Sequence, residues 1–338
     1  MKIFFSSCSG SNSESIYLAE LGRLAGLCTT ETMRLVSTPE EADFILIVDI
    51  YEADLYGGLR RNRVWQKYPE KSFAYCEGDD PPRFLHGLHS SARRSRSETG
   101  RFQSCAYPVH QLYHPNPCPQ PSDVAIVPKD LLFSFVGRAS HKVRKQLFSM
   151  VFPANEVAIK NTTAYDHFHG GNENAEGARR GFWDIAARSK FVLCPSGAGV
   201  SSIRLFEMLE AGIAPVIIAD DWLLPCGPKW EEFALFVPER EIALVYEKVK
   251  AHESEYAQRG RLARKAWEQY FSQDNYWTYL LEAIQTIQKN QKYPESIYAR
   301  GLPLLVFQEW CRQQLIQAVI RLKRGVRSVI SKPAGKRA

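Results

Sequence analysis

Short apolar runs alternate along this chain with segments of helical periodicity. Residues 3–5, 42–49 and 72–76 are largely apolar runs of the length typical of buried strands, and polar or small residues follow each of them. The same pattern returns at residues 131–136 and 215–219, among others. Helical periodicity, with apolar side chains three and four residues apart, separates the runs. This alternation predicts an α/β fold with parallel sheets.

The stretch from 190 to 239 shows the pattern most clearly. It contains a predicted strand at 191–194, a loop of small residues at 196–199, a helix that Gly212 ends, and a second strand at 215–219. A strand, helix and strand in this order predict two parallel strands joined by a right-handed crossover. In such sheets ligands bind beyond the carboxyl ends of the strands.

The start of the predicted helix offers the chemistry of an anion site. Ser201 or Ser202 is a suitable N-cap, and backbone N–H groups at a helix N-terminus favour phosphate. Arg204 lies in the first turn, and Glu207 follows on the same face, where a carboxylate can accept hydrogen bonds from a ribose diol. Together they indicate a nucleoside diphosphate. The alternative is an ordinary crossover helix with a surface ion pair between Arg204 and Glu207.

These residues resemble the C-terminal half of the exostosin-like glycosyltransferases. The family pattern reads S-x-F-x-L-x-P-x-G, then R-L-F-[DE], then G-x-x-P-V-I-x-x-D, and finally L-P and W-x-x-F. Upstream, the chain is similar to the family's S-F-x-G-R…R-x-x-L segment. The matching positions are Ser134 to Arg138, Arg144, Leu147, Ser189, Phe191, Leu193, Pro195, Gly197, Arg204 to Glu207, Gly212, Pro215 to Ile217, Asp220, Leu224, Pro225, Trp230 and Phe233.

The resemblance implies a fold and an activity. The fold would be of the GT-B type, with two Rossmann-like domains facing across a cleft. Residues 1–122 would form the acceptor-side domain, residues 123–288 the donor domain, and residues 289–338 a helical basic tail. The activity would be transfer of a sugar from a nucleotide-sugar donor, with a UDP-sugar favoured, to a hydroxyl of a glycan or lipid-linked glycan. Inversion at the anomeric carbon is the expected outcome, without a metal or other cofactor.

The resemblance also implies which residues hold the donor. Three arginines would bind the diphosphate, small residues and backbone groups would surround it, and a carboxylate would bind the ribose. The expected donor-binding residues are Gly137, Arg138, Arg144, Ser196, Gly197, Ser201, Ser202, Arg204, Glu207 and Asp220. The rival interpretation is a non-catalytic partner subunit that binds nucleotide or glycan within a glycan-synthesis complex.

An acidic turn follows the predicted strand at 72–76. An inverting transfer needs a base to take the proton of the acceptor hydroxyl, and Glu77, Asp79 and Asp80 are the candidates. The alternative is a solvated acidic turn without a catalytic role. Residues 107–121 contain five prolines, so we expect no regular element there and place the linker between the domains at its end.

The composition of the chain argues against several classes of protein. The chain of 338 residues carries a net charge of +6, but residues 321–338 alone hold seven Lys and Arg and no acid. The remainder has 36 basic and 37 acidic residues, which argues against a nucleic-acid binder. The eight cysteines show no C-x-x-C spacing, and no run approaches the length of a membrane span. We therefore expect a cytoplasmic, bacterial-type member of the family.

Residues 303–330 are amphipathic. Phe307, Trp310, Leu315 and Val319 recur at helical spacing, and basic residues lie among and after them. One interpretation is a C-terminal helix that crosses back to the first domain. The other is a basic helix resting on an anionic membrane, as a peripheral contact at its inner face.

Overall fold

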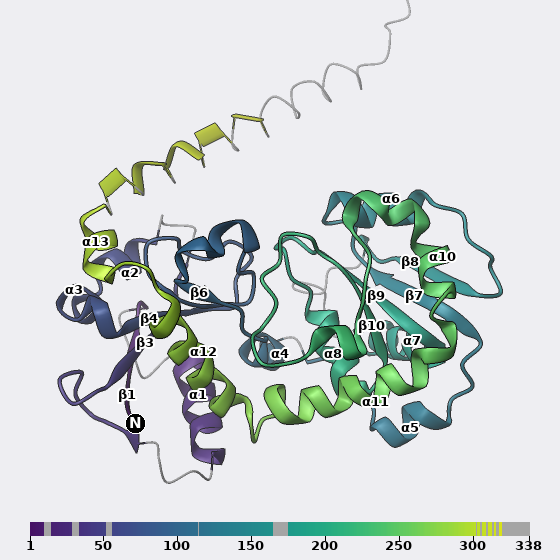
Figure 1. The fold of residues 1–338 in the computed structure, drawn as a ribbon, viewed down its shortest axis with the longest axis horizontal. Helices are drawn as coiled ribbons and strands as arrows, with labels where there is room; N and C mark the ends of the chain where they lie inside the picture. Colours follow the sequence, from purple (N-terminus) through teal and green to yellow (C-terminus); the bar gives the residue numbers. More distant parts are fainter. Residues whose placement is uncertain are drawn as a thin grey trace, which may run out of the picture.

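The computed structural model describes most of the chain, with gaps. The described residues are 1–9, 15–28, 34–51, 56–113, 115–164 and 175–301, together with 303, 304, 306–308, 310–312, 314, 315, 318 and 319. They form two α/β domains that lie side by side (Figure 1). No helix in the described part is both long and apolar enough to span a membrane.

The first domain contains a six-stranded sheet in which every described pair of strands is parallel. The order is β2-β1-β3-β4-β5-β6, and β3 and β4 are buried along their whole length. The strands are β1 (Lys2–Ser7), β2 (Arg34–Leu35), β3 (Phe44–Val48), β4 (Ser72–Cys76), β5 (Gly87–His89) and β6 (Phe102–Gln103). The helices include α1 (Ile16–Leu27), α2 (Gly57–Arg61), α3 (Arg63–Lys67) and α4 (Pro108–Tyr113).

The second domain contains a five-stranded parallel sheet in the order β11-β10-β9-β7-β8. Its strands are β7 (Leu131–Gly137), β8 (Val157–Asn161), β9 (Ser189–Pro195), β10 (Ala214–Ile218) and β11 (Leu235–Phe236). Its helices are α5 (Pro121–Ile126), α6 (Lys142–Ser149), α7 (Ala175–Arg188), α8 (Ile203–Ala211), α9 (Trp230–Phe233), α10 (Val245–Lys250) and α11 (Tyr256–Ala266). The prediction of two Rossmann-like domains is confirmed.

The strand order of the second sheet determines where a ligand can bind. From β7 the chain moves outward to β8, and it then returns to form β9 on the other side of β7. The connections on the two sides of β7 therefore run in opposite directions, and a crevice opens between the carboxyl ends of β7 and β9. Gly137 and Pro195 end these two strands. The residues that follow them are placed to meet a ligand.

The return of the chain to the first domain comes earlier than the sequence predicted. A π-helical turn (Trp267–Phe271) leads from α11 to α12 (Tyr276–Asn290), which packs on β5, β6 and α1. The short helix α13 (Glu295–Arg300) contacts the first domain as well. A crossing back to the first domain, one of the two interpretations of residues 303–330, is thus made by α12, which the sequence had assigned to the donor domain.

One apolar cluster joins the two domains. Tyr75 of β4, Phe206 of α8, Trp222 after β10, and Trp277 of α12 all belong to it and are buried. The hydroxyl groups of Tyr75 and Tyr276 lie 3.0 Å apart within this cluster. Because the core is continuous, the two walls of the space between the domains are held in a defined relation.

Candidate functional site

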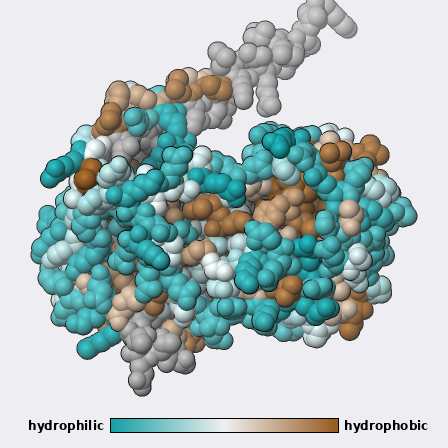
Figure 2. All heavy atoms as spheres, in the orientation of Figure 1, coloured by the Kyte–Doolittle hydropathy of each residue, from teal (hydrophilic) through white to brown (hydrophobic). Residues whose placement is uncertain are grey.

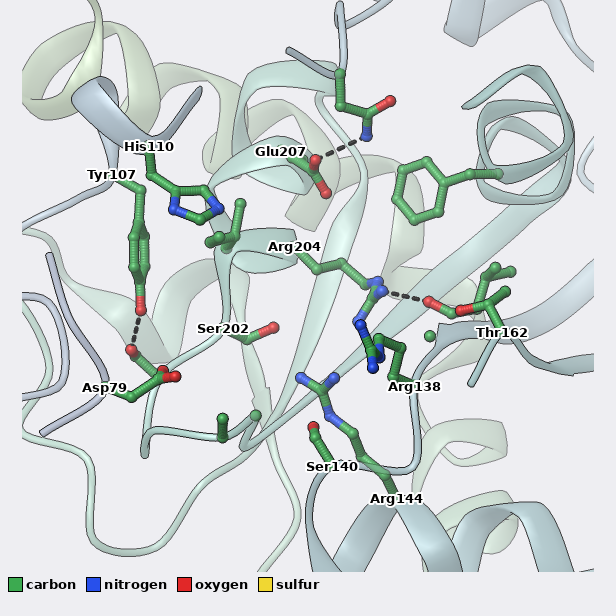
Figure 3. A pocket seen from close by; sticks show the side chains of 18 of the residues that line it. Asp79, Tyr107, His110, Arg138, Ser140, Arg144, Thr162, Ser202, Arg204 and Glu207 are labelled. Atoms are coloured by element: carbon green, nitrogen blue, oxygen red, sulfur yellow. Dashed lines mark hydrogen bonds between the residues drawn. The ribbon is translucent and has the colours of Figure 1, made fainter. Parts of the chain in front are cut away.

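A cavity of about 710 Å³ lies between the two domains, and both contribute to its walls (Figure 3). The second domain supplies the residues after β7 and β9 and the first turn of α8. The first domain supplies the residues after β4 and part of α4. The cavity therefore opens at the carboxyl ends of the strands, as the sheet topology requires.

Three arginine side chains converge on the wall that the second domain provides. Figure 3 shows the guanidinium groups of Arg138, Arg144 and Arg204 pointing toward one another. Arg144 and Arg204 both lie against the ring of Phe135, with guanidinium carbons 5.5 Å and 4.8 Å from its centroid. A planar guanidinium on an aromatic face is held in a fixed orientation. The wall is thus built around closely placed, oriented cations.

Backbone carbonyl groups fix two of these guanidinium groups further. Arg144 donates from Nε to the Ser196 carbonyl at 2.8 Å and from Nη2 to the Pro195 carbonyl at 3.0 Å. Arg204 donates from Nη2 to the carbonyl of Val136. The buried Nε of Arg204 has no hydrogen-bond partner among the described residues, so this side chain retains a donor for a ligand.

The positive charges of Arg144 and Arg204 repel each other. Burial, followed by the charge of Arg204, lowers the pKa of Arg144 to about 9. Burial likewise lowers the pKa of Arg204, and Glu207 partly offsets this. Two neighbouring cations removed from water are costly without a counter-ion. An anion in the cavity would relieve this cost.

Two glycines make room for the guanidinium groups. A Cβ atom at Gly137 would lie 3.0 Å from Nη2 of Arg204, and one at Gly197 would lie 3.1 Å from Nη2 of Arg144. Both distances are tighter than ordinary contacts. Glycine at these positions lets the backbone approach the cations, since a Cβ atom would force each guanidinium to move by a few tenths of an ångström.

Helix α8 positions the remaining donor-side residues. Ser202 is its N-cap, but its side chain makes no capping hydrogen bond, and Gly212 ends the helix with a positive φ of 69°. Ser202, Arg204 and Glu207 all line the cavity. Glu207 accepts a 2.7 Å hydrogen bond from Asn116, and burial raises its pKa. The carboxylate is oriented at the cavity wall by a residue from the segment between the domains.

Two predicted donor residues do not line the cavity. The hydroxyl of Ser196 donates to the carbonyl of Val200 at 3.1 Å and so shapes the loop from within. Asp220 accepts hydrogen bonds from the backbone N–H of Glu239 at 3.1 Å on each carboxylate oxygen. Asp220 is therefore placed as a cap on the segment after β11, apart from the cavity.

The three acidic candidates of the first domain have different surroundings. Asp80 does not line the cavity, and it forms ion pairs with Arg96, at 3.8 Å, and with Arg312. Glu77 and Asp79 both line it. The contacts of Glu77 and Asp79 differ, and they indicate that Glu77 has a structural role while Asp79 is available to a ligand.

Glu77 holds helix α4 in place. Its carboxylate accepts from the backbone N–H groups of Val109 and His110, at 3.1 Å and 2.7 Å, and from the Tyr75 hydroxyl at 2.7 Å. Burial raises the pKa of Glu77 to about 7, while these hydrogen bonds counteract the rise. Pro108 opens the helix, where its missing N–H costs nothing. The expectation that residues 107–121 hold no regular element is therefore wrong.

Asp79 connects the two domains across the cavity. Its Oδ1 atom accepts a 2.9 Å hydrogen bond from the backbone N–H of Gly199, in the loop before α8. Burial raises the pKa of Asp79, and the hydrogen bond from Gly199 counteracts this. Beside it, Ser201 forms hydrogen bonds with Ser91, at 3.0 Å, and with Tyr107. The small-residue loop of the second domain is thus held by polar groups of the first.

Several residues of the cavity wall were not predicted from the sequence. Tyr107 and His110 stand on the wall opposite the arginines (Figure 3). Asn116 also lines the cavity, as do Thr162, Thr163, Arg179 and Phe182. The available signal for Tyr107 and His110 was the presence of aromatic and histidine residues within the proline-rich stretch 107–121. Within the described residues, no group of three or more His, Cys, Asp or Glu side chains is arranged to hold a metal ion.

Comparisons with known proteins agree with the resemblance. Residues 90–251 match the exostosin GT47 domain. Exostosin-1 of Drosophila melanogaster is 32% identical over 103 residues, which is 29% of this chain and 13% of that protein. A probable glucuronosyltransferase of Oryza sativa subsp. japonica is 33% identical over 127 residues, covering 30% of each chain. A probable beta-1,4-xylosyltransferase of Arabidopsis thaliana is 41% identical over 63 residues, or 18% of this chain and 15% of that protein.

These matches span less than a third of the length of each of the three relatives. Among solved structures, MurG of Acinetobacter baumannii is similar, with a TM-score of 0.34 and 10% identity over 78% of this chain and 94% of that one. The two Rossmann-like sheets on either side of a shared cavity are the arrangement called GT-B. The GT47 match includes α4, β7, β9 and α8, and so most of the cavity wall. The match of residues 90–251 to the exostosin GT47 domain therefore confirms the resemblance predicted from the sequence.

Proposed function

We propose that this protein is a glycosyltransferase that moves a sugar from a nucleotide-sugar donor to a glycan hydroxyl. The observation that carries this proposal is a pair of like-charged arginines on one wall, buried Arg144 of α6 and partly buried Arg204 at the start of α8, whose guanidinium groups both lie against the ring of Phe135. Such a pair calls for an anion with more than one negative oxygen, and a nucleoside diphosphate supplies it. The match to the exostosin GT47 domain, and relatives named as glucuronosyl- and xylosyltransferases, support the same reaction class.

The residues on the wall of the second domain would bind the donor nucleotide. Arg138, Arg144 and Arg204 hold the diphosphate and stabilise its charge as it leaves the sugar. The backbone N–H groups at the start of α8 add donors there. Glu207, oriented by Asn116, accepts from the ribose hydroxyls. Because the arginines supply positive charge at the leaving group, the proposed reaction needs no divalent metal.

The acceptor reacts at the opposite wall. In an inverting transfer the acceptor oxygen attacks the anomeric carbon, the bond from that carbon to the diphosphate oxygen breaks, and a base takes the acceptor proton. We assign the base to Asp79, because it faces the cavity while the carboxylate of Glu77 is committed to α4. A UDP-sugar is the proposed donor.

A thermal-shift panel tests the donor proposal. The protein is heated with UDP, GDP or CMP and with their sugars, with and without EDTA. A ligand that binds only the folded state stabilises it by RT ln(1 + [L]/Kd) and so raises the Tm. We expect the uridine compounds to raise the Tm, and EDTA to leave the shift unchanged. No shift from any nucleotide would overturn the donor site, and a shift that EDTA abolishes would overturn metal independence.

A transfer assay with the donor that the panel identifies separates this proposal from the rival interpretation. A non-catalytic partner subunit would bind a nucleotide and show no transfer to any acceptor. The intact arginine wall is compatible with both interpretations. The presence of Asp79 as a cavity-facing carboxylate is the specific feature that favours catalysis.

Gly199 gives a separate prediction about the domain contact. A Cβ atom there would lie 2.2 Å from the Ser91 Oγ atom and 2.8 Å from Oδ1 of Asp79, closer than real contacts allow. Gly199→Ala is therefore expected to displace the loop before α8 and to lower kcat/KM by about tenfold or more, since a misplacement of about 1 Å is costly. Gly22→Ala, in α1 with nothing within 4 Å, is the matched control. Equal kcat/KM values for the two variants would contradict the proposed contact.

A further inference from the structure

The chain beyond α13 carries an exposed apolar stripe. The described residues from 303 to 319 have helical backbone, and the trace leads away from the two domains (Figure 1). Five large apolar side chains lie there at intervals of three to five residues, exposed by between 46% and 69%. We call them the tail stripe: Leu304, Phe307, Trp310, Leu315 and Val319. Figure 2 shows apolar atoms uncovered on this segment.

The tail stripe differs from ordinary exposed apolar residues. Single exposed residues occur on every protein and need no explanation. Here five follow one another on one helical segment, and the rings of Phe307 and Trp310 stack with centroids 6.1 Å apart. A clustered apolar surface of this kind marks an interaction site.

The root of the tail is firmly attached to the first domain. Glu295 is fully buried and accepts from Nε of Arg101 at 3.1 Å. Glu70 accepts from the backbone N–H groups of Glu295 and Ser296 at 2.8 Å and 2.9 Å. The Arg101 guanidinium also lies 3.6 Å from the ring centroid of Tyr298. The start of the tail is thus fixed against the body.

A second contact joins the tail to the rim of the cavity. Arg312 forms an ion pair with Asp80, which is the neighbour of the cavity-lining Asp79. Whatever covers the tail stripe is therefore held near the wall that we assign to the acceptor.

The charge of the chain indicates what covers the stripe. Residues 321–338, directly after it, hold seven Lys and Arg and no acid, while the remainder of the chain is close to neutral. Apolar and aromatic side chains beside a cluster of basic residues match a lipid surface with anionic headgroups. A second copy of the chain fits less well, because it would bring the same seven positive charges together.

We propose that the tail stripe and the basic residues after it dock this protein on an anionic lipid surface. The docked surface then presents the acceptor to the cavity, so the acceptor is a lipid-linked glycan. The second statement rests on the proposed function, while the docking does not.

Vesicle sedimentation of the full chain tests the docking. Phosphatidylcholine vesicles with phosphatidylglycerol are compared with vesicles of phosphatidylcholine alone. We expect more protein to pellet with the anionic vesicles, and less at higher salt. Phe307→Ser combined with Leu315→Ser should lower the partition coefficient by about tenfold or more, because each inserted side chain contributes roughly that factor.

A matched variant controls for the loss of exposed apolar area. Ile126 and Val151 are 82% and 97% exposed and lie on the second domain, so Ile126→Ser combined with Val151→Ser should leave sedimentation unchanged. Absence of pelleting, or equal pelleting of the two double variants, would overturn the proposal. So would a change in oligomeric state of the tail variant in gel filtration, which would identify the stripe as an interface between copies.

The vesicle-sedimentation result does not depend on whether the donor site is assigned correctly. All four positions replaced in these variants are exposed and outside the cavity, so the tail variant should keep the Tm and the nucleotide shift of the unaltered chain. If the vesicles fail to bind while the nucleotide shift persists, the docking is wrong and the transferase proposal stands. The reverse pattern supports docking and contradicts the donor site.

Discussion

Replacing Arg204 with alanine is expected to lower kcat/KM by roughly a hundredfold to a thousandfold, the usual cost of removing one preorganised group that stabilises a developing negative charge. The guanidinium of Arg204 is held by the carbonyl of Val136 and by the ring of Phe135, so it is oriented before the donor arrives. It retains a buried Nε donor for the ligand. Steady-state kinetics with the donor identified by the thermal-shift panel provides the measurement.

Stability should not account for this loss. The charge of Arg204 helps to lower the pKa of its neighbour Arg144, so removing it relieves a repulsion between the two guanidinium groups. We therefore expect the Tm of Arg204→Ala to stay near that of the unaltered protein. Arg204→Lys keeps the positive charge but loses the planar guanidinium. Its kcat/KM should therefore lie between the values of the unaltered protein and of Arg204→Ala.

An exposed arginine serves as the control. Arg240 has a side chain that is 84% exposed and forms an ion pair with the adjacent Glu241. Arg240→Ala should keep full activity, because exposed ion pairs contribute little. If Arg204→Ala retained the kcat/KM of Arg240→Ala, the assignment of the diphosphate to this wall would be wrong.

The donor wall could be predicted from the sequence because its chemistry is local. A strand, a loop of small residues and a helix within about twenty residues bring Gly197, Ser202, Arg204 and Glu207 together. Arg138 comes from a distant segment, yet parallel strands place their carboxyl ends at one edge of the sheet. Ordinary rules for α/β sheets therefore suffice to bring the arginines to one place.

The acceptor wall could not be predicted in the same way. Helix α4 has six residues in a proline-rich stretch, too few for helical periodicity to show. It is held by Glu77, more than thirty residues earlier, and this contact exists only in the folded chain. His110 consequently escaped the sequence analysis. Helix α12 lies almost wholly in the stretch that the sequence assigned to the donor domain, because its packing on the first domain depends on tertiary contacts with β5 and β6.

The assignment of Asp79 as the base makes the second large prediction. Asp79→Asn should lower kcat by about a hundredfold or more, because general-base catalysis contributes factors of roughly 10² to 10⁴. The amide oxygen can still accept the hydrogen bond from Gly199, so the loop before α8 and the nucleotide affinity should be retained. The expected signature is a lower kcat with little change in the thermal shift from the donor.

Asp80→Asn is the natural control, since it alters the adjacent carboxylate and leaves the cavity wall intact. We expect it to change kcat by less than about tenfold, because partly exposed ion pairs contribute little. If both aspartate variants keep their activity while His110→Ala loses it, the base is His110, which stands on the same wall.

The pH dependence of kcat separates a base from a purely structural carboxylate. Asp79 must be ionised to take the acceptor proton, and burial raises its pKa above the ordinary value for aspartate. Activity should therefore fall on the acidic side as pH drops through that raised pKa, and recover as pH rises above it. In Asp79→Asn the residual activity should lose this acidic limb, because the titrating group is gone. An acidic limb that persisted unchanged in the variant would assign it to another group and would remove Asp79 from the mechanism.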